Sequence, residues 1–126
     1  MLTQVRFPSP PQPWQWGFQE VCRRAGDFAL VGAVAMLQLD ANGVCRDSRI
    51  TIFGAGGTPL RMRTAEGILE GSQVDAGVRQ QAAEAVSQAL DPISDIHASA
   101  EYRKDVGGVM ARRALEQALA ASPVNP

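Results

Sequence analysis

The sequence predicts an α+β fold in which a three- to four-stranded antiparallel sheet is followed by about three helices packed on one of its faces. The first half of the chain carries short apolar or alternating segments between turn residues, a pattern typical of strands. The second half carries longer segments with apolar residues at helical spacing. Since 126 residues are the length of one domain, we expect a single domain over residues 1–126, with a disordered tail at 122–126.

The first 23 residues predict one or two strands and a connector. Residues 2–7 alternate in polarity and predict a short edge strand, which the following proline ends. Residues 8–16, with four prolines between positions 8 and 13, predict a stiff extended connector. We expect its two tryptophans, Trp14 and Trp16, to cover an edge of the core. Residues 18–23 fit either a strand or a helical turn, because periodicity does not decide so short a segment.

The next part of the chain predicts a β-hairpin. Residues 24–27 contain a glycine and an aspartate and predict a turn. Residues 28–40 are apolar at nearly every position, as in a strand that is either covered on both faces or packed under helices. Asn42-Gly43 is a strong hairpin signal, so residues 44–53 are expected to form the return strand. The glycine-rich segment 54–59 ends it.

The second half predicts three helices. Thr64 is a candidate N-cap for a short helix that Gly71 ends. Asp75 caps a longer helix that a later proline ends. A final helix is expected from Ser99 to about residue 120. Its apolar face shifts across a Gly-Gly pair at positions 107 and 108, so the helix either bends there or contacts two partners.

Composition and charge exclude several classes of function. Twelve basic and thirteen acidic residues give a net charge of -1, which argues against a dedicated nucleic-acid binder. The longest apolar run, residues 28–37, is too short for a membrane-spanning helix, which needs about 20 residues, and the N-terminus shows no export signal. Two widely separated cysteines and one histidine are too few for a metal centre. We therefore expect a cytoplasmic protein with no metal site and no membrane partner.

The motifs that could carry chemistry have structural explanations that we favour. Residues 54–57 could form an anion-binding nest, but they lack a complete phosphate-binding motif, which favours a turn at a strand end. His97 and Ser99 could suggest a base and a nucleophile, but no third group orients them, so Ser99 is better explained as a helix N-cap. Three carboxylates have the scattered distribution of solvated groups: Asp91, Asp95 and Glu101. The residues alone therefore predict no self-contained active site and no catalytic residue.

Segments distributed along the whole chain resemble a known family. They are Leu2-Thr-Gln-Val-Arg-Phe-Pro8, the segment 18–32 with its Arg-Arg-Ala-Gly-Asp-Phe-Ala motif, the segment 49–61, Ser99-Ala-Glu-Tyr-Arg103 and Arg112-Arg-Ala-Leu115. In this order they resemble the C-terminal domain of the FAD-binding (medium) subunit of molybdenum hydroxylases. That family includes aerobic carbon monoxide dehydrogenase and xanthine dehydrogenase.

The resemblance implies a non-catalytic part of an oxidoreductase, with an antiparallel sheet and three helices. In the family, electrons leave the molybdenum site, cross two [2Fe–2S] clusters in a small subunit and reach FAD. This domain helps to close a flavin site whose other contacts come from a preceding FAD-binding domain, which we expect outside residues 1–126. FAD is therefore the implied cofactor. The implied partners are an FAD-binding domain or subunit, the [2Fe–2S] small subunit and the molybdenum large subunit.

The resemblance also places six residues near the flavin. Leu2 matches an aliphatic residue packed near the ring. The others match a stretch beside the flavin and a nearby loop: Gln19, Glu20, Arg23, Arg24 and Asp27. The two guanidinium groups would favour an anionic flavin or a cofactor phosphate, and the alternative is a pair of solvated turn charges.

A second hypothesis is a free-standing protein-interaction or small-ligand-binding module that reuses the fold. This hypothesis predicts a closed pocket within the single domain. The flavin-subunit hypothesis predicts instead an exposed apolar patch around Trp14, Trp16 and Phe28, where the partner docks.

Overall fold

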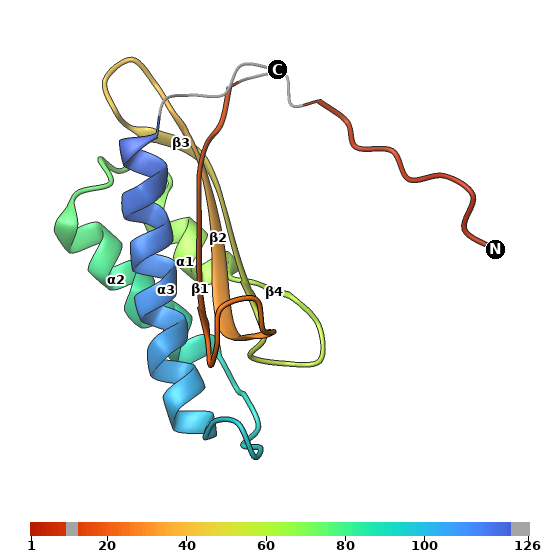
Figure 1. The fold of residues 1–126 in the computed structure, drawn as a ribbon. Helices are drawn as coiled ribbons and strands as arrows, with labels where there is room; N and C mark the ends of the chain where they lie inside the picture. Colours follow the sequence, from red (N-terminus) through yellow and green to blue (C-terminus); the bar gives the residue numbers. More distant parts are fainter. Residues whose placement is uncertain (10–12, 122–126) are drawn as a thin grey trace.

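The computed structural model describes residues 1–9 and 13–121 and has two layers, a sheet and a set of helices (Figure 1). In chain order the elements are β1 (Gln15–Cys22), β2 (Ala29–Leu39), β3 (Cys45–Phe53), β4 (Leu60–Arg61), α1 (Arg63–Leu69), α2 (Ala76–Ala89) and α3 (Ala100–Ala120). The strands form one antiparallel sheet in the order β1-β2-β3-β4. The predicted α+β fold, with strands first and helices second, is confirmed.

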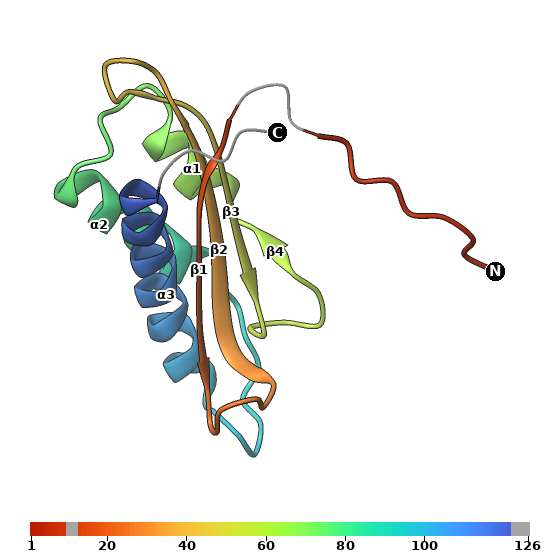
Figure 2. The same cartoon turned by 45° about the horizontal axis from the view of Figure 1, so that its top comes forward.

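The helices cover only one face of the sheet (Figure 2). On β2, Val31, Ala33, Ala35 and Leu37 are fully buried toward the helices. The intervening residues of β2 point to the other face, because successive side chains in a strand alternate. The sequence left open whether this strand is covered on both faces or packed under helices. It is packed under helices on one face, although its residues are apolar on both faces.

α3 packs very closely against the sheet because small residues line the contact. A Cβ atom added at Gly17 of β1 would lie 2.0 Å from the Ala114 carbonyl oxygen and 3.0 Å from the Ala118 backbone nitrogen. Ala111, Ala114 and Ala118 are themselves fully buried on α3. The backbones of helix and strand therefore approach as closely as a glycine permits.

α3 also runs without interruption through Gly107 and Gly108, so a contact with a second partner explains the shift of its apolar face. A Cβ atom added at Gly108 would lie 2.3 Å from the Ser87 Oγ atom and 2.7 Å from the Ala83 carbonyl oxygen, both on α2. One added at Gly107 would lie 2.4 Å from the Leu90 side chain. The Gly-Gly pair is the point where α2 and α3 pack together.

The strand predicted over residues 2–7 is wrong for the described structure. Residues 1–9 are extended and exposed, and they run away from the sheet on the side opposite the helices (Figures 1 and 2). The physical reason is that a strand needs a neighbour for its backbone groups, and no described residue pairs with this segment. The expected tail at 122–126 lies outside the described residues.

Other boundaries were predicted with mixed success. Residues 18–22 belong to a strand, which begins at Gln15, inside the expected connector, and ends before Arg23. Met62 rather than Thr64 precedes the first helical residue, and no side chain caps α1. Asp75 and Ser99 are N-caps as predicted, since their side chains accept hydrogen bonds from backbone N–H groups at 2.9 and 3.1 Å. No helix in the described ranges is long and apolar enough to cross a membrane.

Candidate functional site

Three loops converge at one end of the sheet and form the candidate site, at the lower end of the views in Figures 1 and 2. They are the β1–β2 turn, the β3–β4 loop and the α2–α3 loop. A cleft of about 340 Å³ lies between the last two, lined by Ala29, Gly54, Ala55, Gly56, Gly57, Ile93, Asp95, His97 and Arg103. The glycine-rich segment therefore ends a strand, as predicted, and also forms one wall of a cleft.

The β1–β2 turn has a defined local structure. Gly26 adopts a φ of 82°, which only glycine reaches without strain. The backbone N–H of Asp27 donates to the Arg24 carbonyl oxygen at 3.1 Å, and the Asp27 carboxylate accepts from the Phe28 N–H at 2.8 Å. These bonds close the turn and leave the side chains of Arg23, Arg24 and Phe28 exposed at its surface.

A hydrogen bond joins this turn to the α2–α3 loop. Arg23 Nη1 lies 3.2 Å from His97 Nδ1. Because a guanidinium group can only donate, Nδ1 of His97 is the acceptor in this hydrogen bond. Sequence reasoning could not find the pair, because the two residues are 74 positions apart and neither belongs to a spacing motif.

The α2–α3 loop is held in place by Arg103, whose side chain is only 8% exposed. Its guanidinium donates to Asp95 Oδ2 at 2.8 Å and to the Ile93 carbonyl oxygen at 3.1 Å. The other oxygen of Asp95 accepts from the N–H groups of His97 and Ala98. The hydrogen bond from Arg103, together with these two, lowers the pKa of Asp95 to about 2. Asp95 is exposed, as expected of a solvated carboxylate, but it is also paired with a buried arginine of α3, which the sequence did not predict.

The structure brings only some of the predicted site residues together. Arg23, Arg24 and Asp27 share the β1–β2 turn, and Gln19 and Glu20 lie on the strand that leads to it. Gln19 Nε2 donates to Gln117 Oε1 of α3 at 2.9 Å, which fixes the amide toward the helices. Glu20 is exposed.

Leu2 lies elsewhere. Its side chain is 81% exposed in the N-terminal segment, which joins β1 at the end opposite the turn (Figure 1). Within the described chain, Leu2 therefore has no contact with the other five predicted site residues. Whether it lies near a flavin depends on a partner, and its role stays a prediction.

The apolar patch expected around both tryptophans and Phe28 is not one surface. Trp16 pairs with Met36 near one end of the β1–β2 ladder, whereas Phe28 precedes β2 at the other end. Nor do the tryptophans cover the core edge. Trp16 is 49% exposed on the face that the helices leave free, and Trp14 lies beneath the Arg49 guanidinium, 5.7 Å from the ring centroid.

Larger residues gather on this free face, which we call the open sheet face and define by Trp14, Trp16, Phe18, Val34, Met36, Arg49, Thr51 and Phe53. Phe18 and Phe53 stack with their ring centroids 5.5 Å apart. The aromatic residues of this face thus lie on or next to β1 and on β3, with Val34 and Met36 of β2 between them, and Glu20 lies on the same face beyond Phe18.

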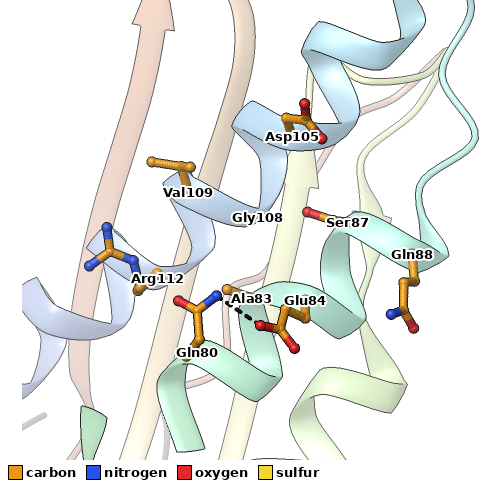
Figure 3. A pocket seen from close by; sticks show the side chains of 9 residues that line it. All are labelled: Gln80, Ala83, Glu84, Ser87, Gln88, Asp105, Gly108, Val109 and Arg112. Carbon is orange, nitrogen blue, oxygen red and sulfur yellow. Dashed lines mark hydrogen bonds between the residues drawn. The ribbon is translucent and has the colours of Figure 1, made fainter. Parts of the chain in front are cut away.

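A second cleft, of about 270 Å³, separates α2 from α3 (Figure 3). Its lining is mostly polar: Gln80, Ala83, Glu84, Ser87, Gln88, Asp105, Gly108, Val109 and Arg112. Gln80 donates to Glu84, Arg112 donates to Glu116 outside the cleft, and the Ser87 hydroxyl donates to a carbonyl oxygen of α3. The first two of these bonds lie within one helix each, and the Ser87 bond joins α2 to α3 beside their close contact at Gly108.

The thiols offer no activated nucleophile. Burial raises the pKa of Cys45 to about 11, and desolvation, followed by the Glu20 carboxylate, raises the pKa of Cys22. Both are therefore protonated at neutral pH. In the described part of the chain, no three His, Cys, Asp or Glu residues cluster so that they could hold a metal ion.

The chain matches a protein-family model described as the CO dehydrogenase flavoprotein C-terminal domain, over residues 16–118. Among curated proteins, it is 39% identical over 119 residues to the 6-hydroxypseudooxynicotine dehydrogenase complex subunit alpha of Paenarthrobacter nicotinovorans, covering 94% of this chain and 40% of that protein. It is 32% identical to the carbon monoxide dehydrogenase medium chain of Afipia carboxidovorans, covering 95% of this chain and 41% of the relative.

Solved structures agree with the sequence matches. Reconstituted CO dehydrogenase from Oligotropha carboxidovorans aligns with a TM-score of 0.83 at 31% identity, covering 91% of this chain and 40% of that one. Quinoline 2-oxidoreductase from Pseudomonas putida 86 aligns with a TM-score of 0.81 at 33% identity. The alignment covers 90% of this chain and 39% of that one. The chain thus spans about 40% of the length of the relatives it matches. Because the matched residues 16–118 include nearly all of the sheet and of the three helices, the chain belongs to the CO dehydrogenase flavoprotein C-terminal domain family.

Proposed function

We propose that this chain acts as the C-terminal, non-catalytic part of the FAD-binding subunit of a molybdenum hydroxylase-type dehydrogenase. In this role it helps to close the flavin site through which electrons pass from iron–sulfur clusters to FAD. The observation that carries the proposal is the family match over residues 16–118, which includes the whole β1–β2 turn with its two exposed arginines.

The residues at the end of the sheet fit an anionic, flat group that is bound mainly by another domain. Arg23 and Arg24 present two guanidinium groups, and the Phe28 ring is 94% exposed beside them. Gly26 and the two Asp27 hydrogen bonds give the turn a fixed shape, so the charges are presented by a structured loop. FAD would supply the redox chemistry, while the chain would orient the ring, exclude water and stabilise negative charge.

The same proposal assigns roles to the remaining predicted residues. Gln19 and Glu20 would lie along the flavin edge of β1, and Asp27 would hold the turn. Leu2 would pack near the ring once the N-terminal segment is placed by its partner. The implied partners are an FAD-binding domain or subunit, a [2Fe–2S] small subunit and a molybdenum large subunit, assembled in the cytoplasm.

A double substitution tests the role of the turn. Arg23→Ala/Arg24→Ala removes two exposed charges, and we expect folding to be nearly intact but flavin reduction in the assembled complex to be slower by about tenfold or more. The matched control is Arg112→Ala/Arg113→Ala, a second adjacent arginine pair, located on α3. The measurement is the rate of flavin bleaching after the substrate of the complex is added.

The control should keep the normal rate, because α3 lies on the far layer from the turn. An equal slowing by both pairs would indicate a general charge effect and would reject the assignment to the turn. Normal reduction with the turn variant would also reject it. The alternative of a free-standing ligand module predicts a closed pocket. The two clefts described above, of about 340 and 270 Å³, both open to solvent and do not favour it.

A further inference from the structure

A series of hydrogen bonds connects the interior of the molecule with the α2–α3 loop. It begins at Arg103 of α3, whose side chain is 8% exposed. Arg103 donates to Asp95 Oδ2 at 2.8 Å, and Asp95 Oδ1 accepts from the His97 N–H at 2.8 Å and from the Ala98 N–H at 3.0 Å. The Asp95 N–H itself donates to the Ala98 carbonyl oxygen at 3.0 Å. The backbone of His97 is therefore fixed relative to a buried group of α3.

The packing of α3 on β1 holds this loop and the β1–β2 turn in a set arrangement. β1 ends at Cys22, directly before Arg23, and α3 begins at Ala100, shortly after His97. The two elements are in backbone contact at Gly17, where an added Cβ atom would lie 2.0 Å from a carbonyl oxygen of α3. The turn and the loop thus extend from one rigid framework, and the contact of Arg23 with His97 joins them beyond its end.

The two arginines of the turn differ in what holds them. Arg23 Nη1 lies 3.2 Å from His97 Nδ1, and in the described part of the chain Arg23 makes no other side-chain hydrogen bond or ion pair. The Arg24 side chain makes neither with any described residue. An arginine that is already held in one conformation loses less entropy when it meets a ligand. Arg23 is therefore the preorganised charge of the turn.

Histidine suits this position because it fixes an arginine without cancelling its charge. A carboxylate at position 97 would also accept from Arg23, but its negative charge would neutralise the guanidinium. An imidazole nitrogen that accepts a hydrogen bond brings no negative charge. The nearby Asp95 carboxylate is used instead by Arg103 and by two backbone N–H groups. The charge of Arg23 thus stays available to a ligand.

We propose that His97 is a positioning residue of the flavin site. Its Nδ1 atom holds the Arg23 guanidinium in the orientation that stabilises negative charge on the bound FAD, and Arg103 fixes His97 through Asp95. The inference rests on the proposed function, which places Arg23 beside the flavin. It adds the α2–α3 loop to the parts of the chain that determine how this charge is placed, and it requires no contact between His97 and the flavin.

Two substitutions of His97 test the hydrogen bond in the assembled, flavin-loaded complex. His97→Leu removes the acceptor, whereas His97→Asn keeps one, since its side-chain oxygen is as many bonds from the backbone as Nδ1. His97→Leu should slow flavin reduction by about threefold or more and make the flavin midpoint potential more negative, because a displaced guanidinium stabilises the reduced flavin less. His97→Asn should stay within about twofold of the unmodified rate.

A comparison of double variants shows whether His97 acts through Arg23. In an Arg23→Ala background the contact is already absent, so His97→Leu should change the rate of flavin reduction by less than about 1.5-fold. The matched control is an Arg24→Ala background, which lacks the neighbouring charge but keeps the contact. There His97→Leu should still slow flavin reduction by about threefold or more.

Amide hydrogen exchange gives a readout in the chain without partner or cofactor. The Asp27 N–H donates to the Arg24 carbonyl oxygen and closes the β1–β2 turn. Its exchange should become about threefold faster or more in His97→Leu and should stay within about twofold in His97→Asn. The Gly43 N–H, which donates to the Asp40 carbonyl oxygen at 3.0 Å in the β2–β3 turn, is the internal reference and should not change.

The His97 side chain is exposed, so both variants should fold, and thermal melts check this. If His97→Leu does not fold, Arg23→Ala removes the same hydrogen bond from the other side and replaces it in the exchange measurement. Exchange at Asp27 that stays unchanged when the bond is removed would overturn the positioning role.

The remaining outcomes separate this proposal from the proposed function. A normal rate and potential in His97→Leu, while Arg23→Ala is slow, would overturn the positioning role and leave the flavin role standing. An equal slowing by His97→Leu in both arginine backgrounds would do the same, as would a failure of His97→Asn to restore the rate. Normal flavin reduction in Arg23→Ala/Arg24→Ala would overturn the placement of the turn at the flavin, and the positioning role with it.

Discussion

The two faces of the sheet differ most clearly on β1 and β2, where α3 packs against one of them. The covered face carries Ala33 and Ala35 on β2 and Gly17 on β1, so that α3 approaches to backbone contact. The open sheet face carries Trp16 and Phe18 on the same strand as Gly17, and both are more than two-fifths exposed. Small residues are required where α3 comes to backbone contact with the sheet, whereas Leu37, Ile50 and Ile52 fill the rest of the covered face. Large aromatic residues without a cover indicate that the neighbour comes from elsewhere.

The largest effect should come from filling the tightest contact on the covered face. Gly17→Ala places a methyl group 2.0 Å from the Ala114 carbonyl oxygen, so α3 must shift. We expect a loss of about 3 kcal/mol in the free energy of unfolding, measured by urea denaturation. A loss below about 0.5 kcal/mol would mean that α3 does not pack on β1 as described.

A somewhat smaller loss of stability is expected near the sheet edge, where the Glu66 carboxylate of α1 accepts a hydrogen bond from a backbone N–H of β3 in place of a neighbouring strand. Its carboxylate is buried and accepts from the Ile50 N–H at 2.8 Å and from Arg61 at 2.8 Å. Burial alone would raise the pKa of Glu66, but these hydrogen bonds outweigh it and lower the pKa. Glu66→Ala should cost about 2 kcal/mol, because it leaves a buried N–H without a partner. Arg46→Ala, which removes an exposed ion pair with Asp40, should cost less than about 0.5 kcal/mol.

At the candidate site, position 26 requires glycine because of its backbone conformation and not because of close packing. Gly26→Val should cost about 1–3 kcal/mol, because its φ is 82° while no atom lies within 4 Å of an added Cβ. Gly57→Val is the matched control, since it is equally uncrowded and its φ is not in the left-handed region. Thermal melts of both variants provide the comparison, and equal melting temperatures would show that the turn is described wrongly.

The loop that Arg103 holds should show a specific dependence on pH. The pKa of Asp95 is about 2 in the folded chain, against about 3.9 for an unfolded aspartate. Its contribution to stability is therefore full above about pH 4 and is lost as the pH falls toward 2. Asp95→Asn should lose less stability than the unmodified chain between pH 4 and pH 2. Identical pH profiles in urea denaturation would contradict the Asp95–Arg103 pair.

The smallest effect on folding is expected on the open sheet face. Trp16→Ala should change the free energy of unfolding by less than about 1 kcal/mol, since half of the side chain is already in water. Gly17 and Trp16 are neighbours on the same strand but lie on opposite faces, so the costs of Gly17→Ala and Trp16→Ala compare the two faces directly. A cost above about 2 kcal/mol would mean that Trp16 belongs to the core of this chain.

Local sequence patterns predicted most of the helices and strands. They could not predict contacts between residues that are distant in the sequence. Asp75 and Ser99 were identified as caps because an N-cap acts within three residues. β4 was not identified, since two residues are too few to show a period. The strand predicted over residues 2–7 has the right alternation, but alternation does not say which chain provides the neighbouring strand.

The same limit applies to the candidate site. Gly26 and Asp27 could be placed in a turn from their residue types alone, and the structure confirms the turn. The contact of Arg23 with His97 and the ion pair of the buried Arg103 with Asp95 depend on how the α2–α3 loop and α3 lie against the sheet. The flavin roles of the turn residues came from resemblance to a family, because isolated charges on a turn carry no spacing signal.

The central claim is that this chain is the C-terminal part of a flavin-binding subunit. The most direct test is the visible absorption spectrum of the tagged chain after mild purification from its own cells. We predict flavin and iron–sulfur absorption that elutes together with the chain in gel filtration, along with a molybdenum-containing large subunit. A colourless chain, alone or with proteins that carry neither cofactor, would contradict the claim and favour a free-standing module.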